Sequence, residues 1–428
     1  MSAAFSKAAP VTAPPAMLTP VAGGVTAPRG FQAAGVHAGI KRKRRDVALI
    51  VSAVPAAAAA TYTTNIVKAA PLLVTREHIA QGPIRAIVCN SGNANAVTGE
   101  QGLKDARRMA AVAAEAIGAR PEQVAVASTG VIGVPLPMDK IEAGIRRAAA
   151  ALGVGDGDAS DDGGSDSGSL AAARAIMTTD TVPKQIAVEF SLRGKTVRIG
   201  AIAKGSGMIH PNMATMLAFV TTDAAVSPAA LQAVVSRSVD RTYNRITVDG
   251  DTSTNDMVVV LANGLAGNEP LGAGDPELDV FAQALDYVNT YLAKAIARDG
   301  EGATKLIEVR VEGAASEADA LQVARAIAGS NLVKTAVYGN DPNWGRILAA
   351  AGRSGVDFDP SRVDIWVGDV LVARHGAGVP FDEARAAAAL QGPEVVLTVA
   401  LQAGTASAVV WTCDLTEDYV RINARYRT

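Results

Sequence analysis

The sequence predicts an α+β protein in which large sheets are covered by helices. Short runs rich in β-branched residues, at residues 47–51, 84–89 and 124–127, are typical of buried strands. Residues 105–118 and 275–298 carry apolar side chains at helical spacing and predict amphipathic helices. With 428 residues, 49% hydrophobic and 4% aromatic, the chain can bury one large core or two moderate ones, packed mainly by aliphatic side chains and alanine.

Composition excludes several classes of partner. The 40 Lys and Arg residues nearly balance the 42 Asp and Glu residues, and a net charge of -2 attracts neither nucleic acid nor an anionic membrane. Two cysteines cannot build a disulfide framework, and no apolar stretch approaches the roughly 18 residues that a membrane helix needs. We therefore expect a cytoplasmic protein of enzyme size, with no nucleic-acid or membrane partner.

Three segments are expected to be irregular. Residues 1–22 are rich in Ala and Pro and lack the features of a signal or transit peptide, so they predict a disordered tail. The basic run KRKRR at residues 41–45 precedes a predicted strand and is interpreted as a solvated loop. Residues 153–169 are dense in Gly, Asp and Ser and predict a flexible surface loop; they lack the pattern of a calcium-binding loop.

In the first third of the chain, residues 61–65 predict a further strand, and Cys89 ends the strand at residues 84–89. We interpret Cys89 as a buried strand-end residue, because a reactive cysteine needs an electropositive setting that the sequence does not show. The polar stretch at residues 90–95, NSGNAN, follows directly and fits either a functional loop or an ordinary turn.

The strand at residues 124–127 ends at Ser128, Thr129 and Gly130, after a turn at residues 121–123. A threonine hydroxyl beside a glycine N–H can supply two donors to a negatively charged oxygen, as acyl transfer requires. The same residues also fit a plain turn at the end of a strand.

The segment KGSGMIHPNMATMLAFV, residues 204–220, is the centre of the chain's predicted chemistry. A strand is predicted at residues 197–203 and ends before Gly205 and Gly207, and Thr215 enters the next predicted strand, residues 216–221. A threonine hydroxyl can attack the carbonyl of its own N-terminal peptide bond, and the α-amine released by cleavage, with a reference pKa of about 7.7–8.0, can then act as base. The alternative is an ordinary strand threonine.

The second half of the chain predicts further strands and helices and no cofactor loop. The run at residues 246–260 has acidic residues without a nearby histidine, so we expect a tight hairpin and no metal. The glycine-rich loop at residues 299–304 lacks the ending of a phosphate-binding loop. The remaining elements are expected as strands at residues 185–190, 306–311 and 333–338, helices at residues 227–239, 317–328 and from about 344, and strands from there to the C-terminus.

Seven segments in order along the chain resemble one known family. They are GGVTAPRGFQAAGVHAGIK, CNSGNANA, STGVIG, MTTDT, KGSGMIHPNMATML, DGEGATK and YGNDPNWGRI. Together they resemble the ornithine acetyltransferase (ArgJ) family, the glutamate N-acetyltransferases of arginine biosynthesis, over almost all of residues 23–428. The resemblance implies an N-terminal-nucleophile-like α+β fold, related to that of self-cleaving aminopeptidases, with a catalytic domain at residues 23–304 and a smaller α/β domain at residues 305–428 that contributes to the site.

The resemblance also implies the reaction and its residues. The chain is expected to cut itself between Ala214 and Thr215, to carry an acetyl group on Thr215 from N-acetylornithine to glutamate, and to assemble as two alpha and two beta chains. No cofactor is implied, and acetyl-CoA as a co-substrate is left open. The oxyanion hole is carried over to Thr129 and Gly130, and the substrate contacts to Thr179, Lys204, Thr215, Glu301, Asn423 and Thr428.

Two other interpretations remain beside this one. A related self-cleaving aminopeptidase or amidase would pass the acyl group to water, and the pair of Lys204 and Glu301, suited to an amino-acid substrate, distinguishes it. A non-catalytic metabolite-binding protein would keep an intact chain. His210, close to the cleavage point, fits either a general base or a residue that packs in the turn.

Overall fold

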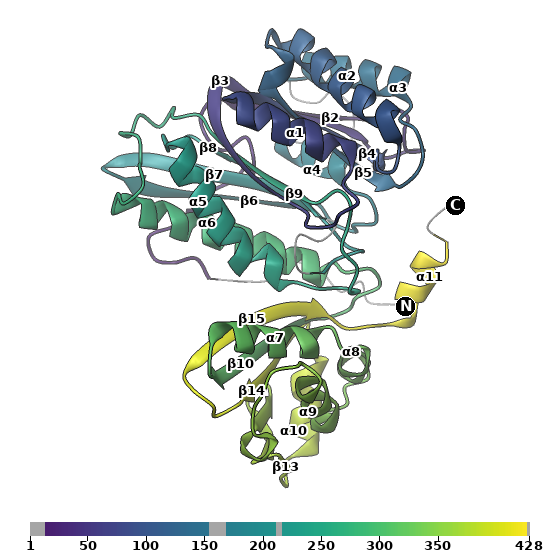
Figure 1. Cartoon of the computed structure of the whole chain (residues 1–428), viewed down its shortest axis with the longest axis vertical. Helices are drawn as coiled ribbons and strands as arrows, with labels where there is room; N and C mark the ends of the chain where they lie inside the picture. The colour runs from purple at the N-terminus through teal and green to yellow at the C-terminus, as the bar shows by residue number, and fades with distance from the viewer. Residues whose placement is uncertain (1–12, 154–167, 211–215, 426–428) are drawn as a thin grey trace.

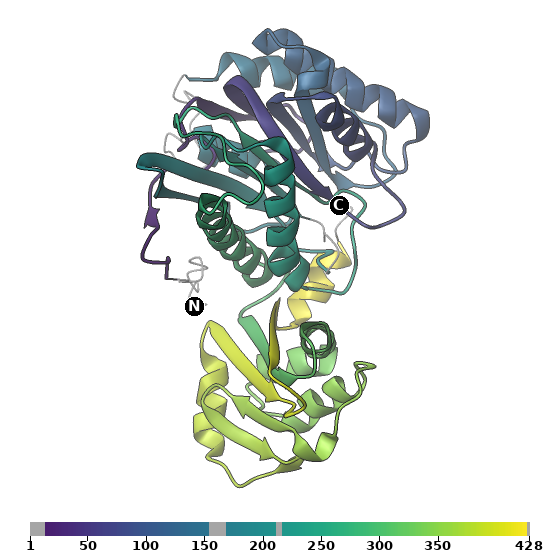
Figure 2. The same cartoon turned by 60° about the vertical axis from the view of Figure 1, so that its left-hand side comes forward.

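The computed structural model of the chain describes residues 13–153, 168–210 and 216–425. Two bodies are visible, each containing one mixed sheet covered by helices (Figures 1 and 2). In the part of the chain that the structure describes, the larger body has a nine-stranded sheet and the smaller a six-stranded sheet. The predicted α+β class is therefore confirmed. The boundary expected at residue 305 falls in the connection between the last helix of the larger body and the first strand of the smaller one.

Within the described residues, the larger body contains the first nine strands and six α-helices. Its strands are β1 (Thr19–Pro20), β2 (Phe31–Val36), β3 (Val47–Tyr62), β4 (Ile84–Asn93), β5 (Val124–Val131), β6 (Lys184–Leu192), β7 (Lys195–Lys204), β8 (Leu217–Thr222) and β9 (Met257–Ala262). Its helices are α1 (Ala70–Gln81), α2 (Gly99–Ile117), α3 (Met138–Ala150), α4 (Gly168–Ile176), α5 (Pro228–Arg241) and α6 (Glu277–Arg298).

The long strand β3 joins the two parts of the larger sheet. The strand order is β1-β6-β7-β8-β9-β3-β4-β5, with β2 also paired to β3. The first part of β3 pairs with β2 and β4, its register shifts between Val51 and Ala56, and its second part pairs with β9. The two parts of the sheet share a core in which Ile50 and Ile87 on one side are grouped with Leu217 on the other and with α4. Helices α1, α2 and α3 form a second core against β4 and β5, and α5 and α6 form a third against β7, β8 and β9.

The smaller body follows from Leu306 onward. Its strands are β10 (Leu306–Ala314), β11 (Asp364–Val367), β12 (Val370–Arg374), β13 (Ala377–Gly378), β14 (Glu394–Ala400) and β15 (Ala406–Cys413), in the order β13-β12-β11-β14-β10-β15. Its helices are α7 (Glu317–Ala328), α8 (Asn331–Tyr338), α9 (Trp344–Gly352) and α10 (Glu383–Gln391). The chain then returns toward the larger body through α11 (Glu417–Asn423), as Figure 2 shows.

The structure corrects two predicted strands. Residues 333–338 were expected as a strand because β-branched residues alternate there, but they belong to helix α8, whose N-terminus is capped by the Ser330 side chain bonded to the Val333 N–H. Burial of Val333, Ala336 and Val337 follows helical spacing, and this packing overrides the local β preference. The prediction of strands to the C-terminus was likewise wrong for α10 and α11.

The expected hairpin at residues 246–260 is also absent from the described structure. Strand β9 pairs in parallel with β8 and antiparallel with β3, and Ile246 instead forms a bridge to Trp411 in β15. Strand β3 ends at Tyr62, before the end of the strand expected at residues 61–65. The polar residues before β9 therefore form a connection, which proves important for the site.

Two of the segments expected to be irregular are partly ordered. In the predicted tail, residues 1–12 lie outside the described residues, but Leu18 is buried and β1 pairs with β6. In the predicted surface loop, residues 154–167 lie outside them as well, and its end, from Gly168, belongs to α4. In the basic run, Arg42 is exposed as expected, but the Lys41 Nζ turns inward and donates to the Met177 carbonyl at 2.9 Å.

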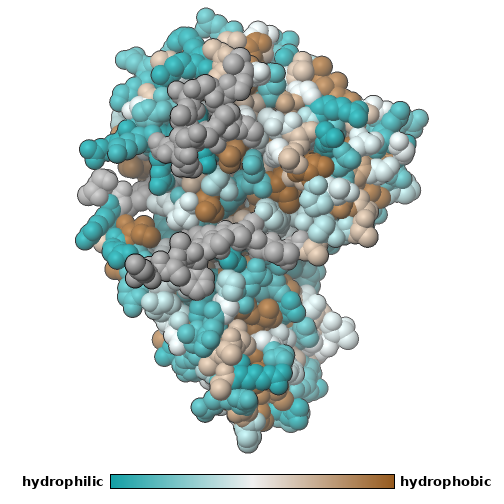
Figure 3. Space-filling model, turned by 180° about the vertical axis from the view of Figure 1, so that it is seen from behind, coloured by the Kyte–Doolittle hydropathy of each residue, from teal (hydrophilic) through white to brown (hydrophobic). Residues whose placement is uncertain are grey.

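On the face opposite to that shown in Figure 1, apolar residues are scattered among hydrophilic ones. Figure 3 shows them as small hydrophobic patches. No helix among the described residues is long and apolar enough to span a membrane.

Candidate active site

A pocket of about 290 Å³ lies where elements from both ends of the chain meet. Its lining includes six of the residues predicted as site residues, namely Thr129, Gly130, Thr179, Lys204, Glu301 and Asn423. Ala214, Thr215 and Thr428 lie outside the described residues. A pocket of this size fits a small metabolite.

Thr129 and Gly130 lie near the end of β5. The backbone of Gly130 has a φ of +131°, and a Cβ there would lie 2.3 Å from the Gly92 carbonyl carbon, so only glycine fits. The Lys204 Nζ donates to the Thr129 hydroxyl oxygen at 3.4 Å. Because this oxygen already accepts a hydrogen bond, the Thr129 hydroxyl proton can be directed to another oxygen in the pocket.

Lys204 ends β7 and is almost completely buried. Burial lowers the pKa of its amine, while the carboxyls of Asp180 and Asp256 act in the opposite direction. A substrate carboxylate beside this amine would favour its charged form. Lys204 can therefore provide the positive end of the pocket.

Glu301 provides the opposite charge and is fixed by the C-terminal helix. The Asn423 Nδ2 donates to its Oε2 at 2.7 Å, and the backbone N–H of Glu301 donates to the Ser206 carbonyl at 3.0 Å. A Cβ at Gly207 would lie 2.3 Å from the Glu301 carboxyl carbon, so a glycine at this position makes room for the acid. The structure thus brings Asn423 of α11 to the pocket.

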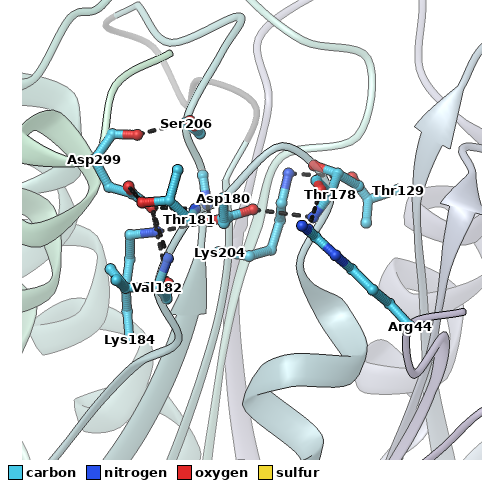
Figure 4. Close-up of polar contacts among 11 residues, drawn as sticks. Arg44, Thr129, Thr178, Asp180, Thr181, Val182, Lys184, Lys204, Ser206 and Asp299 are labelled. Atoms are coloured by element: carbon cyan, nitrogen blue, oxygen red, sulfur yellow. Dashed lines mark hydrogen bonds and ion pairs between the residues drawn. The ribbon is translucent and has the colours of Figure 1, made fainter. Parts of the chain in front are cut away.

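A buried ionic network supports the turn that carries Thr178 and Thr179. The Lys184 Nζ lies 2.7 Å from both the Asp180 Oδ1 and the Asp299 Oδ2, and all three side chains are nearly inaccessible to solvent (Figure 4). Burial alone would raise the pKa of Asp180, but the charges of Lys184 and Lys204 outweigh it and hold that pKa well below its usual value.

The network fixes backbone on both sides of Asp180. Its Oδ1 accepts the Gly205 N–H at 2.7 Å and its Oδ2 accepts the Thr178 N–H at 3.0 Å. The Arg44 guanidinium reaches the same turn and donates to the Thr178 carbonyl at 3.4 Å (Figure 4). Asp180 therefore joins the end of β7 to the turn at the pocket. Only the motif MTTDT marked this region in the sequence, and the pairing with Lys184 and Asp299 was missed.

The polar stretch at residues 90–95, whose role was open, has a structural role here. The Asn93 Nδ2 donates to the carbonyls of Val134 and Pro135, both at 3.0 Å, and the Asn95 Nδ2 donates to the Gly102 carbonyl at 2.9 Å. Asn90 accepts a hydrogen bond from Ser128 at 2.6 Å. These amides therefore stabilise the loops around the end of β5.

Cys89 and His210 are not among the described residues that line the pocket. Cys89 is buried, as predicted, and burial raises the pKa of its thiol to about 12. It does not end its strand, because β4 continues to Asn93. A ring nitrogen of His210 lies 3.1 Å from the Thr247 hydroxyl, and burial lowers the pKa of this histidine. These contacts favour packing in the turn over a role as base.

Among the described residues, no group of three or more His, Cys, Asp and Glu side chains is arranged to bind a metal ion.

Comparison with known proteins identifies the family. A model described as the ArgJ family matches residues 32–428. The chain belongs to the ArgJ family. The arginine biosynthesis bifunctional protein ArgJ of Symbiobacterium thermophilum is 62% identical over 411 residues, which cover 95% of this chain and 99% of the relative. The protein of the same name from Caldanaerobacter subterraneus subsp. tengcongensis is 52% identical over 410 residues, with the same shares.

Two solved structures are also similar. A crystal structure of the bifunctional protein ArgJ from Bacillus halodurans is 51% identical, with a TM-score of 0.47, and covers 48% of this chain and 97% of its own. An ornithine acetyltransferase from Mycobacterium tuberculosis, complexed with ornithine, is 40% identical, with a TM-score of 0.40, and covers 45% of this chain and 98% of its own.

As an ArgJ family member, the chain is an enzyme of arginine biosynthesis and an acyltransferase. Its two mixed sheets covered by helices agree with the α+β class that the sequence predicted.

Proposed function

We propose that this ArgJ family enzyme transfers the acetyl group of N2-acetyl-L-ornithine to L-glutamate through an acetyl ester on Thr215, after cutting itself between Ala214 and Thr215. The observation that carries the proposal is the pocket itself. It combines an amine at Lys204, a carboxylate at Glu301 and the donors of Thr129 and Gly130. These groups are complementary to an amino acid that carries an acyl group.

Each group has a distinct role in this proposal. Lys204 meets the substrate α-carboxylate, and Glu301, positioned by Asn423, meets a substrate amine. Thr179 lines the same pocket. Thr179 and Thr428 are assigned to the substrate as further contacts. The Thr129 hydroxyl and the Gly130 N–H stabilise the negative oxygen that develops on the acyl carbonyl.

Self-cleavage begins with attack of the Thr215 hydroxyl oxygen on the carbonyl carbon of Ala214. The peptide C–N bond breaks, an ester forms, and the Thr215 nitrogen becomes a free amine. Water then hydrolyses the ester, which leaves a carboxylate on Ala214 and restores the hydroxyl. The free amine now lies on the residue that carries the nucleophile and can accept its proton.

Acetyl transfer repeats this chemistry with a substrate. The Thr215 oxygen attacks the acetyl carbonyl, the C–N bond to ornithine breaks, and the leaving amine takes up a proton. The α-amine of glutamate then attacks the acetyl ester, which forms N-acetylglutamate and regenerates the hydroxyl. Each step moves the acyl group between an amine and an oxygen, and the proposal requires no cofactor.

The two chains produced by cleavage, residues 1–214 and 215–428, are proposed to remain together. Strand β7 of the first pairs with β8 of the second from Ile199 to Lys204, and β3 pairs with β9. The buried ion pair between Lys184 and Asp299 also joins the two. We further propose that two copies of each chain assemble and that the enzyme acts in the cytoplasm.

Intact-mass measurement and single-turnover labelling test the proposal. The purified enzyme should give two masses, for residues 1–214 and 215–428, whereas Thr215→Ala should remain one inactive chain. Incubation of the cut enzyme with acetyl-labelled N-acetylornithine should place label on Thr215, located by peptide mapping, and glutamate should remove it as N-acetylglutamate. Label on Cys89, His210 or Lys204, or an active uncut chain, would overturn the mechanism.

The same assay separates the alternatives. Release of acetate at a rate independent of glutamate would indicate the hydrolase interpretation. Because the curated relatives are named bifunctional, the assay also includes acetyl-CoA as donor. Label from acetyl-CoA on Thr215 would add the synthesis of N-acetylglutamate to the proposed function.

A further inference from the structure

The connection before β9 contains two adjacent buried residues, Asn255 and Asp256, that the proposed mechanism does not use. They belong to the segment that the sequence predicted as a hairpin. The side chain of Asn255 lines the pocket, and its Nδ2 donates to two backbone carbonyls, that of Ala94 at 2.6 Å and that of Ser128 at 2.8 Å. Ser128 directly precedes Thr129, so Asn255 contacts the turn that carries the proposed oxyanion donors.

Asp256 contacts the other half of the site. It is completely buried, and its Oδ1 accepts the backbone N–H of Met216 at 2.9 Å. The carbonyl of Met216 in turn accepts the N–H of Met257 at 3.2 Å. Met216 follows Thr215 in the chain and directly precedes β8. Both its N–H and its carbonyl therefore form hydrogen bonds with this connection and the start of β9.

The second oxygen of Asp256 has no hydrogen-bond donor among the described residues. Burial raises the pKa of this carboxyl well above its usual value, although the Met216 N–H, the charge of Lys204 and the hydroxyls of Thr63 and Ser253 act in the opposite direction. A protonated carboxyl has the shape of an amide and still offers an acceptor to Met216.

The two halves of the site belong to strands that do not pair with each other. In the sheet order, β9, β3 and β4 lie between β8 and β5. Neighbouring strands are about 4.8 Å apart, so three intervening strands separate the end of β5 from β8 within the sheet. The adjacent side chains of Asn255 and Asp256 bridge this distance directly.

We propose that Asn255 and Asp256 form a positioning pair that sets the oxyanion turn at Thr129 in register with the strand that begins after Thr215. Both residues act through the backbone of others, Asn255 through Ser128 and Asp256 through Met216. The inference rests on the proposed function, because it takes the roles of Thr129 and Thr215 from there.

Asn255→Asp tests the first half of the pair. The substitution keeps the shape but replaces two N–H donors with an oxygen that faces two carbonyls. A displacement of about 1 Å between nucleophile and oxyanion donors can cost on the order of a hundredfold in rate. We expect kcat for acetyl transfer to fall about a hundredfold while KM for N-acetylornithine changes little, because Lys204 and Glu301 remain in place.

Asn268→Asp is the matched control. The Asn268 Nδ2 also donates to two backbone carbonyls, those of Ala225 and Glu269, and Asn268 is not among the described residues that line the pocket. This variant should lose stability as Asn255→Asp does and keep the wild-type kcat. Equal loss of kcat in the two variants, or a change of KM alone in Asn255→Asp, would overturn the proposal.

Asp256 is tested by loss and rescue. Asp256→Ala removes the acceptor for the Met216 N–H and should slow both self-cleavage, followed by intact mass, and acetyl transfer. Asp256→Asn keeps that acceptor and should recover most of both rates. If the Asn variant is as slow as the Ala variant, the acceptor is not what matters and the proposal fails. If wild-type enzyme itself forms no acetyl ester on Thr215, the proposed function fails instead.

Discussion

Asp180→Asn should destabilise the enzyme far more than the loss of a surface ion pair would. Lys184 and Lys204 carry two positive charges in this part of the interior, and Asp180 and Asp299 carry two negative ones. The substitution keeps the shape of Asp180 but leaves one positive charge without a balancing carboxylate. Breaking a buried pair from one side typically costs about 3–5 kcal/mol of folding free energy, against about 0–1 kcal/mol for an exposed pair.

The hydrogen bonds of Asp180 determine where in this range of about 3–5 kcal/mol the cost of Asp180→Asn falls. An asparagine oxygen can still accept from Lys184 and Gly205, which favours the lower end. Its amide group would then face the Thr178 N–H, so two donors would meet where a carboxylate oxygen now accepts. An unsatisfied buried group costs about 1–3 kcal/mol. We therefore expect a total loss of about 4 kcal/mol.

Urea denaturation of the assembled enzyme, followed by circular dichroism, measures this loss. The charge argument is checked with Lys184→Met and the double variant. The double variant leaves Asp299 with Lys204, so its charges are balanced again, and its loss should be smaller than the sum of the two single losses. A loss below about 1 kcal/mol for Asp180→Asn, or strict additivity in the double variant, would refute the argument.

The same variant has a defined pH dependence. The pKa of Asp180 is lower in the folded protein than in the unfolded chain, so its contribution is fully present above the unfolded value, about 3.9. It is lost as the pH falls through the lower folded value. The difference in stability between wild type and Asp180→Asn should therefore be constant from about pH 5 to 8 and shrink in more acidic solution.

Three further predictions follow from single residues. Thr129→Ala should lower kcat for acetyl transfer by about 100–1,000-fold with little change in KM, because an oxyanion donor acts mainly in the transition state; steady-state kinetics showing only a raised KM would make Thr129 a binding residue. Cys89, with a pKa of about 12, should resist iodoacetamide at pH 8 until urea unfolds the protein, and rapid labelling of the folded enzyme, measured by mass, would contradict its burial. Burial lowers the pKa of Lys41 to about 8, so the folded protein binds fewer protons there than the unfolded chain, and the stability of wild type relative to Lys41→Met should rise between about pH 8 and 10.5; a constant difference in urea denaturation would contradict this.

Much of the larger body follows from local patterns. The apolar runs that predicted strands at residues 84–89 and 197–203 lie within β4 and β7, and the helical spacing at residues 275–298 lies in α6. The predictions for these segments were right because their side chains are buried on the faces that local periodicity implies. The strand predicted at residues 333–338 was wrong because valine and threonine alternate there as they do in a strand. Capping by Ser330 and burial at helical spacing stabilise a helix instead.

The residues around the pocket divide in the same way. Thr129, Gly130, Lys204 and Glu301 were found because motifs mark them in the sequence, and the structure brings them to one pocket. Asp180, Lys184 and Asp299 were not assembled into a network, because each is an ordinary charged residue until its burial and its partners are known. Asn255 and Asp256 lay in a segment assigned to the wrong element.

The sequence by itself determined the fold class, the family and the identity of the proposed nucleophile, Thr215, since these depend on local spacing and on motifs in a fixed order. Only the tertiary structure decided how the chemistry is supported. Asp299 pairs with a lysine 115 residues earlier, and the Asn255 amide bonds a carbonyl 127 residues earlier. Such contacts depend on how the sheets and helices pack, and the energies of buried charges depend on the removal of water, which no local pattern of residues specifies.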